Sequence, residues 1–221
     1  MKSFKALSAL LSYPSAELCA AIPQIRDVLH QEGLIGPRRL AELDTLLHQL
    51  ADRDLYELQE RYVLLFDRSR TLSLNLFEHI HGESRDRGGA MVDLLETYRA
   101  GGFDLAGPEL PDHLPVLLEY LSTRPLPEAR AILADAAHII AALAERLHRR
   151  EAAYAAVMTT LVALSEADAE PPAELAGIPD DDPEDLAALD AVWEEAQVTF
   201  GPDPNAGCPV SRDLLARMDA R

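Results

Sequence analysis

Apolar residues recur at helical spacing through almost every segment of the first 165 residues, and no segment alternates apolar and polar residues as a half-buried strand would. The longest periodic stretch is Glu128–Arg150, whose apolar positions are Ile132, Leu133, Ile139, Ile140, Leu143 and Leu147. Aromatic residues make up only 5% of the chain, so leucine and alanine, both strong helix formers, must supply most of the packing. The sequence therefore predicts an all-α protein, a single helical bundle domain of about nine or ten helices.

Proline, glycine and capping residues predict where the helices begin and end. Ser15 is a candidate N-cap, Pro23 predicts a kink or break, Gly101 and Gly102 end a helix, and Pro127 suits a first helical turn. The predicted helices are Lys2–Leu11, Ser15–His30, Pro37–Ala51, Leu55–Leu65, Leu74–His81, Asp86–Arg99, a helix that Pro111 and Pro115 frame and that ends at Ser122, Glu128–Arg150 and Ala152–Leu164.

The composition changes after Leu164. Residues 166–221 hold 15 acidic and 3 basic side chains, and their first part is rich in proline and poor in large apolar residues. A short amphipathic helix, Asp182–Glu195, carries a docking stripe of Leu186, Leu189 and Trp193. We therefore expect a helical domain over residues 1–165, followed over residues 166–221 by an acidic linker, that short docking helix and a mobile, partly disordered tail.

The charge and the cysteine count narrow the function. A net charge of −18 repels nucleic acid and anionic membranes, and it attracts basic segments of other proteins. Improved solubility is the alternative reason for the same charge. Cys19 and Cys208 form neither a disulfide framework nor a zinc motif, and no stretch predicts a secretory leader or a membrane span. These features predict a cytoplasmic protein that does not insert into a membrane.

Two segments concentrate the titratable residues, namely LSLNLFEHIHGESRDRGG (72–89) and ELPDHLPVLLEYL (109–121). His79, His81 and His113 are candidate metal ligands, although a pair two residues apart on a helix diverges by about 200°, and a hydrogen-bonded structural cluster is the alternative. Asp112 is either a helix cap or a functional residue. No nucleophile elbow, phosphate loop or dinucleotide motif is present, so the sequence predicts neither catalysis nor a cofactor.

Three segments together resemble the respiratory nitrate reductase assembly chaperones of the NarJ type, within the TorD-like group of maturation chaperones. They are LNLFEHIHGESRDRGGAMVDLLETYRAGGF (74–103), ELPDHLPVLLEYL (109–121) and AVWEEAQVTFGPDPNAGCP (191–209), and ALLSYPSAEL and ERYVLLFD (60–67) fit as well. The resemblance implies a TorD-like helical chaperone that binds the apo form of the nitrate reductase catalytic subunit through its basic or amphipathic N-terminal peptide. Such a chaperone holds the subunit for molybdenum cofactor insertion, restrains premature membrane attachment and is absent from the final enzyme.

The resemblance also suggests which residues bind the client peptide. Leu76, Phe77 and Leu118 would receive apolar guest side chains, Glu83, Asp112 and Glu119 would meet guest cations, and the arginines would order the acids. The full candidate set is Leu76, Phe77, His79, His81, Glu83, Arg85, Arg87, Tyr98, Asp112, His113, Leu118 and Glu119.

Four further hypotheses follow. The protein could instead serve another molybdoenzyme, or it could be a metal-dependent hydrolase that uses His79, His81 and His113. The acidic C-terminal region could compete for the client site with Trp193 as its anchor, or it could be a solubilising tail. Contact of His79 or His113 with the client would make the affinity depend on pH between about 5 and 8.

Overall fold

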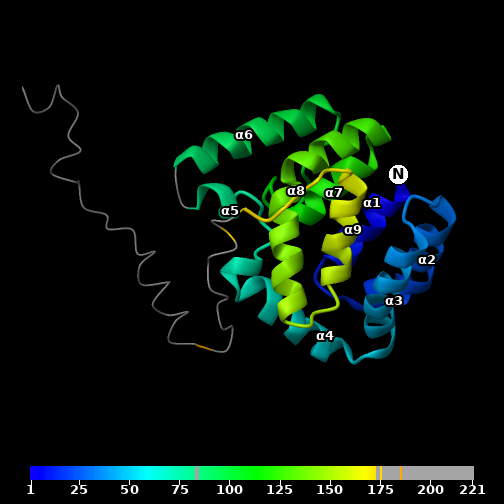
Figure 1. Ribbon diagram of the computed structural model, residues 1–221. Helices are drawn as coiled ribbons and strands as arrows, with labels where there is room; N and C mark the ends of the chain where they lie inside the picture. Colours follow the sequence, from blue (N-terminus) through cyan, green and yellow to red (C-terminus); the bar gives the residue numbers. More distant parts are fainter. Residues whose placement is uncertain (83–84, 173–174, 176–184, 186–221) are drawn as a thin grey trace, which may run out of the picture. The chain divides into compact units, whose positions relative to one another are not determined.

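The computed structural model describes residues 1–82, 85–172, 175 and 185, with Arg85 described by its backbone alone. The chain divides into two compact units, 1–184 and 185–221, and every element below belongs to the first unit. The predicted helix Asp182–Glu195 and the predicted mobile tail lie outside the described residues, apart from Asp185. Within the described part the protein is all-α and has no strand, which confirms the predicted fold class (Figure 1).

Nine α-helices are present in the described residues, together with a π-helical turn (η1) and a 3₁₀ turn (η2). Their bounds are α1 Lys2–Leu10, α2 Ala16–Glu32, α3 Pro37–Asp52, α4 Leu55–Tyr62, η1 Val63–Asp67, η2 Arg70–Leu72, α5 Glu78–His81, α6 Arg85–Ala100, α7 Leu114–Ser122, α8 Leu126–Arg149 and α9 Ala155–Ser165.

The helix ends follow the local signals in the sequence in most places. The Ser15 side chain accepts a hydrogen bond from the Leu18 N–H at 3.1 Å and caps α2, and α8 has a proline in its first turn. Gly102 has a φ of +75°, which a residue with a side chain rarely adopts, so the chain turns directly after α6. Of the kink or break predicted at Pro23, the break does not occur: α2 continues through Pro23, and Ile22, Ile25 and Leu29 are buried along the helix on both sides of it.

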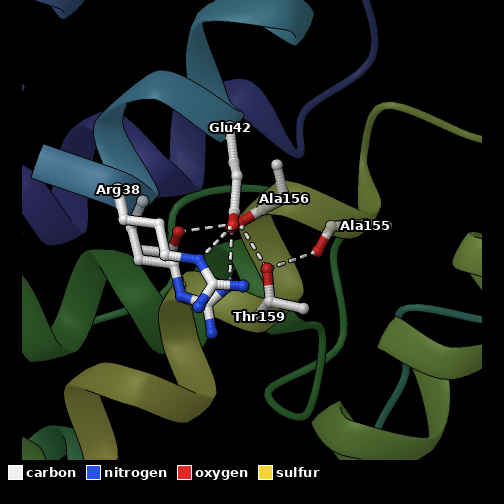
Figure 2. Close-up of polar contacts among 7 residues, drawn as sticks. Arg38, Glu42, Ala155, Ala156 and Thr159 are labelled. Atoms are coloured by element: carbon white, nitrogen blue, oxygen red, sulfur yellow. Dashed lines mark hydrogen bonds and ion pairs between the residues drawn. The ribbon is translucent and has the colours of Figure 1, made fainter.

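The helices pack around one apolar core, both against their neighbours in sequence and against distant helices. The long helix α8 packs along α9, α1 packs against α2 and α7, and α3 packs against α2 and α9 (Figure 1). Figure 2 shows polar contacts at the α3–α9 junction, where Glu42 accepts hydrogen bonds from Arg38 at 3.1 Å and from Arg39 at 2.5 Å. On α9, the Thr159 hydroxyl donates to backbone carbonyls of its own helix, so its hydroxyl is satisfied without a partner from α3. Leucine and alanine fill the core as the composition predicts.

The turn after α6 fits closely against α7. A Cβ added to Gly101 would lie 2.7 Å from Tyr120 Cε2 and 2.8 Å from its hydroxyl oxygen, and Arg124 donates to the Gly101 carbonyl at 2.6 Å. We expect Gly101→Ala to lower the free energy of unfolding by about 1–3 kcal/mol, because Tyr120 is buried and cannot move away cheaply.

Gly88 provides the matched control for this prediction. It lies within α6, and a Cβ there would meet nothing within 4 Å. Gly88→Ala should therefore raise the free energy of unfolding by about 0.5–1 kcal/mol. Urea unfolding of both variants measures the contrast, and equal stability of the two variants would contradict the close packing at Gly101.

Candidate binding groove

The two charged segments that stand out in the sequence lie against each other. Asn75 and His113 form an isolated antiparallel bridge, in which the Leu76 N–H donates to the Asp112 carbonyl at 3.1 Å and the Leu114 N–H donates to the Leu74 carbonyl at 2.8 Å. The backbone from Leu74 to Phe77 is therefore not helical, and the predicted helix Leu74–His81 was wrong over this half. These main-chain bonds bring residues 35 or more positions apart into one site.

Asp112 connects the two segments through its side chain as well. The Asp112 Oδ2 accepts a hydrogen bond from the Phe77 N–H at 2.9 Å, whereas Oδ1 has no hydrogen-bond partner among the described residues. Asp112 as a whole is 0% exposed. Burial raises the pKa of this carboxyl, because the charged form loses its hydration. Asp112 does not cap α7, whose N-cap is His113 without a side-chain hydrogen bond, so the capping alternative was wrong.

An apolar cavity of about 280 Å³ opens beside Asp112. One wall comes from the 74–80 segment, one from α6 and α7, and one from α8. We call this cavity the apolar groove; its lining consists of two acids, Asp112 and Asp135, and eight apolar residues, Leu76, Phe77, Ile80, Leu94, Leu117, Ile132, Ala136 and Ile139. Ile80 is 50% exposed at its edge, so apolar surface continues from the groove into solvent.

The histidines and Arg87 support this groove from the α5–α6 side. His79 Nε2 lies 2.8 Å from the Ser73 carbonyl, and the His81 ring packs edge-on against Phe77 with centroids 5.8 Å apart. Arg87 lies 3.3 Å from Glu78 Oε1. Each of these side chains therefore has a local partner that fixes the position of the short helix α5.

Two of the predicted site residues belong to the core. Tyr98 and Leu118 are both 0% exposed, and the Tyr98 hydroxyl donates to the Pro111 carbonyl at 2.8 Å, which ties α6 to the loop before Asp112. Neither side chain is open to a ligand in this arrangement. Glu83 and the Arg85 side chain lie outside the described residues.

His113 and Glu119 face a different cavity. The successive residues Asp112 and His113 line two different cavities, and the one beside His113 has a volume of about 450 Å³. We call it the acidic pocket; its polar and aromatic lining includes Tyr13, Tyr62, Asp67, Glu109, His113 and Glu119. The described members of the predicted set thus divide among two cavities, the core and the α5–α6 side of the apolar groove.

The three histidines proposed as metal ligands do not converge. His79 bonds the Ser73 carbonyl, His81 packs on Phe77, and His113 lines the acidic pocket. Within the residues that the structure describes, no group of three His, Cys, Asp or Glu side chains is placed to hold a metal ion.

Sequence reasoning missed Ile80, Leu94 and Leu117 in the groove lining, and it missed the whole α8 wall. Ile132, Ala136 and Ile139 form an i, i+4, i+7 row in α8, and Asp135 lies at its edge. The row is visible in the sequence, but its spacing is the same as that of core residues elsewhere in the helix. Only the position of α8 beside the 74–80 segment distinguishes the groove wall from the core.

Burial of two histidines predicts an acid-sensitive fold. Burial lowers the pKa of His79 and of His113 below the ordinary value of 6.5. Well above pH 6.5 both rings are neutral in both states. As the pH falls through 6.5 the unfolded chain takes up protons before the folded protein does, so stability falls with the pH. The slope is at most about 1.4 kcal/mol per pH unit for each histidine.

Urea unfolding between pH 7.5 and 5.5 measures this effect. The double variant His79→Gln and His113→Gln should show a flatter pH profile, and the exposed His30→Gln control should keep the profile of the unaltered chain. Identical slopes for the double variant and the control would show that these two rings do not cause the acid sensitivity.

The fold and the groove define a helical binding protein, in which an apolar cavity carries a buried carboxylate. No helix in the described part of the chain is long and apolar enough to cross a membrane. The family model described as nitrate reductase delta subunit matches residues 15–160, and the chain belongs to this family.

Three relatives of known description align with this chain over most of their own length. The nitrate reductase molybdenum cofactor assembly chaperone NarJ of Escherichia coli K12 is 42% identical over 202 residues, which cover 91% of this chain and 86% of the relative. The probable chaperone NarW of the same organism is 39% identical, over 96% and 89%. The probable NarJ of Bacillus subtilis is 33% identical, over 74% and 88%. The resemblance seen in the sequence is thus confirmed.

Proposed function

We propose that the protein is an assembly chaperone for respiratory nitrate reductase and has no catalytic activity of its own. It binds the apo catalytic subunit in the cytoplasm through the N-terminal peptide of that subunit. It holds the subunit until molybdenum cofactor is inserted, restrains premature attachment to the membrane-bound subunit, and is not part of the finished enzyme. Family membership and the names of the relatives support the chaperone role.

The observation that carries the peptide-binding proposal is the apolar groove beside the buried Asp112, whose Oδ1 has no hydrogen-bond partner among the described residues. A Leu- or Phe-sized guest side chain that fills the groove gains about 1.5–3 kcal/mol. Asp112 Oδ1, which has no partner among the described residues, is a further acceptor beside the groove once a guest opens access to it, and Asp135 adds a second carboxylate from α8. An amphipathic guest helix with one apolar and one basic face satisfies both the apolar walls and the acids.

The expected affinity suits a chaperone that must release its client. Three buried anchors contribute roughly 5–9 kcal/mol before the entropy of ordering is subtracted. The upper value corresponds to a dissociation constant of about 1 μM or slightly less.

Calorimetric titration with a synthetic N-terminal peptide of the catalytic subunit tests the proposal. We expect one peptide per chain and micromolar affinity, and no heat from a scrambled peptide of the same composition. A panel of N-terminal peptides from other molybdoenzymes tests the choice of client, and equal binding of all of them would overturn the assignment to nitrate reductase.

Cells without the protein should accumulate a catalytic subunit that lacks molybdenum, and a fully loaded subunit in such cells would overturn the role in cofactor insertion.

A further inference from the structure

Arg146 is a buried charged side chain that lines neither the apolar groove nor the acidic pocket. It lies near the end of α8 and is 2% exposed. Removing a guanidinium group from water costs free energy unless its N–H groups find acceptors inside the protein. The position of this side chain is therefore explained by the backbone segments to which it donates.

Two segments that are far apart in the sequence meet at the Arg146 guanidinium. Its Nη1 donates to the Thr71 carbonyl in η2 at 2.7 Å, and its Nη2 donates to the Leu175 carbonyl at 2.5 Å. The planar fork of arginine allows one side chain to reach two acceptors in fixed directions. Arg146 thereby fixes η2 against α8, with which η2 also packs.

The η2 turn leads directly into one wall of the apolar groove. Ser73 follows Thr71 by two positions, and its carbonyl lies 2.8 Å from His79 Nε2. The Ser73 hydroxyl oxygen accepts a hydrogen bond from the Asn75 N–H at 3.2 Å. These contacts attach the segment 74–80, which forms that wall, to Ser73. The position of the wall thus depends on Ser73, and the position of Ser73 depends on η2.

The second acceptor of Arg146 belongs to the chain that follows α9. We call residues 166–172 and 175 the strap. After α9 the chain returns to α8 (Figure 1), where Glu166 forms an ion pair with Arg130 at 2.8 Å. Arg130 and Arg146 lie roughly 24 Å apart along α8, so the strap follows that helix. Leu175 is 8% exposed, and its burial holds its carbonyl at the Arg146 guanidinium.

We propose that Arg146 is a positioning residue for the client site. Without touching the client, it holds the 74–80 wall of the apolar groove in place through Thr71 and Ser73. Leu175 of the strap keeps the guanidinium in the orientation that this requires. The inference rests on the proposed function, since it assigns the apolar groove to the client peptide. Loss of Arg146 loosens this one wall, whereas the α7 and α8 walls keep their own packing.

Amide hydrogen exchange of Arg146→Met, followed by NMR on the full chain, tests the positioning role without any ligand. The Phe77 N–H, which donates to Asp112 Oδ2, should exchange at least tenfold faster than in the unaltered chain, because its segment opens more often. Arg146→Lys keeps the charge and a donor, so its rate should lie between the two, and it carries the same test if Arg146→Met does not fold. Leu175→Ala should accelerate exchange at Phe77 at least threefold.

Leu29→Ala is the matched control for a loss of stability alone. Leu29 is 0% exposed in α2 and lines neither cavity, so its truncation destabilises the core without touching η2. The amide of the buried Leu47 in α3 should exchange faster in both Arg146→Met and Leu29→Ala, which compares their losses of global stability. The Phe77 amide of Leu29→Ala should keep the rate of the unaltered chain.

Titration with the N-terminal client peptide connects the positioning role to binding. Arg146→Met should weaken peptide binding at least fivefold, whereas Leu29→Ala should bind the peptide as the unaltered chain does. Equal acceleration of the Phe77 amide in these two variants, or undiminished peptide affinity of Arg146→Met, would overturn the proposal. An unchanged Phe77 rate in Leu175→Ala would overturn the part that is assigned to the strap.

The exchange comparison separates this proposal from the proposed function. If the unaltered chain did not bind the peptide, the function proposed for the apolar groove would be wrong. The exchange rates of the Phe77 amide would still show whether Arg146 positions the 74–80 wall, because that measurement needs no client.

Discussion

Replacing Ala136 by Trp is expected to weaken binding of the N-terminal client peptide at least tenfold. Ala136 is half-buried on α8 and lines the apolar groove, where the cavity volume is about 280 Å³. An indole side chain at this position occupies the space that a guest leucine or phenylalanine would fill. The loss of one buried anchor, about 1.5–3 kcal/mol, corresponds to roughly a 10- to 150-fold change in the dissociation constant.

Calorimetric titration of the variant with the peptide measures the change. Ala131→Trp is the matched control, because Ala131 is exposed on the same helix and does not line the groove. Its affinity should equal that of the unaltered chain. Unfolding of both variants in urea shows whether Ala136→Trp keeps the fold. A folded Ala136→Trp protein with undiminished affinity would place the peptide outside the apolar groove.

The second large effect is expected at Arg146, a buried arginine near the end of α8. It is 2% exposed and donates to the Thr71 carbonyl at 2.7 Å and to the Leu175 carbonyl at 2.5 Å. Arg146→Met keeps much of the apolar stem but leaves both carbonyls without this donor. We expect the free energy of unfolding to fall by about 3 kcal/mol, because buried acceptors without partners cost about 1–3 kcal/mol each.

In thermal unfolding, the same loss of stability should lower the Tm of Arg146→Met by about 6–12 °C, since 1 kcal/mol corresponds to about 2–4 °C in a chain of this length. The Tm of Arg146→Lys should lie between that of Arg146→Met and that of the unaltered chain, because an ammonium group lacks the planar fork that reaches two carbonyls. Arg38→Met serves as control: Arg38 pairs with Glu42 on the surface (Figure 2), and its loss should change the stability by less than about 0.5 kcal/mol. Equal effects of Arg38→Met and Arg146→Met would contradict the role of the buried arginine.

Helix positions could largely be predicted from the sequence, because their signals are local. Ser15, Gly101 and Pro127 act within one turn of the backbone, and the structure confirms each of them. The segment Leu74–Phe77 and Pro23 show where local reasoning fails. In the first case, main-chain bonds to residues 112–114 replace helical bonds, and in the second, core packing retains a helix that proline disfavours.

The candidate site shows a similar division. Both charged segments were identified in the sequence, but Tyr98 and Leu118 turned out to lie in the core, and His113 and Glu119 face the acidic pocket. Asp135 and Ala136 could not be found, because an apolar row on α8 looks the same whether it faces a core or a cavity. The division of the chain at residue 165, the docking stripe with Trp193 and the competition by the acidic region remain predictions.

The sequence by itself determined the helical class, most helix ends, the acidic character and the family, since periodicity, capping and charge are properties of neighbouring residues. Only the tertiary structure decided that Asp112 lies buried beside an apolar groove and bonds the Phe77 N–H, that His113 lies in a different cavity, and that Arg146 joins Thr71 to Leu175. The physical reason is that burial and hydrogen-bond satisfaction depend on which distant segments meet. Which segments meet is determined by the packing of the whole core, and a local sequence pattern does not determine it.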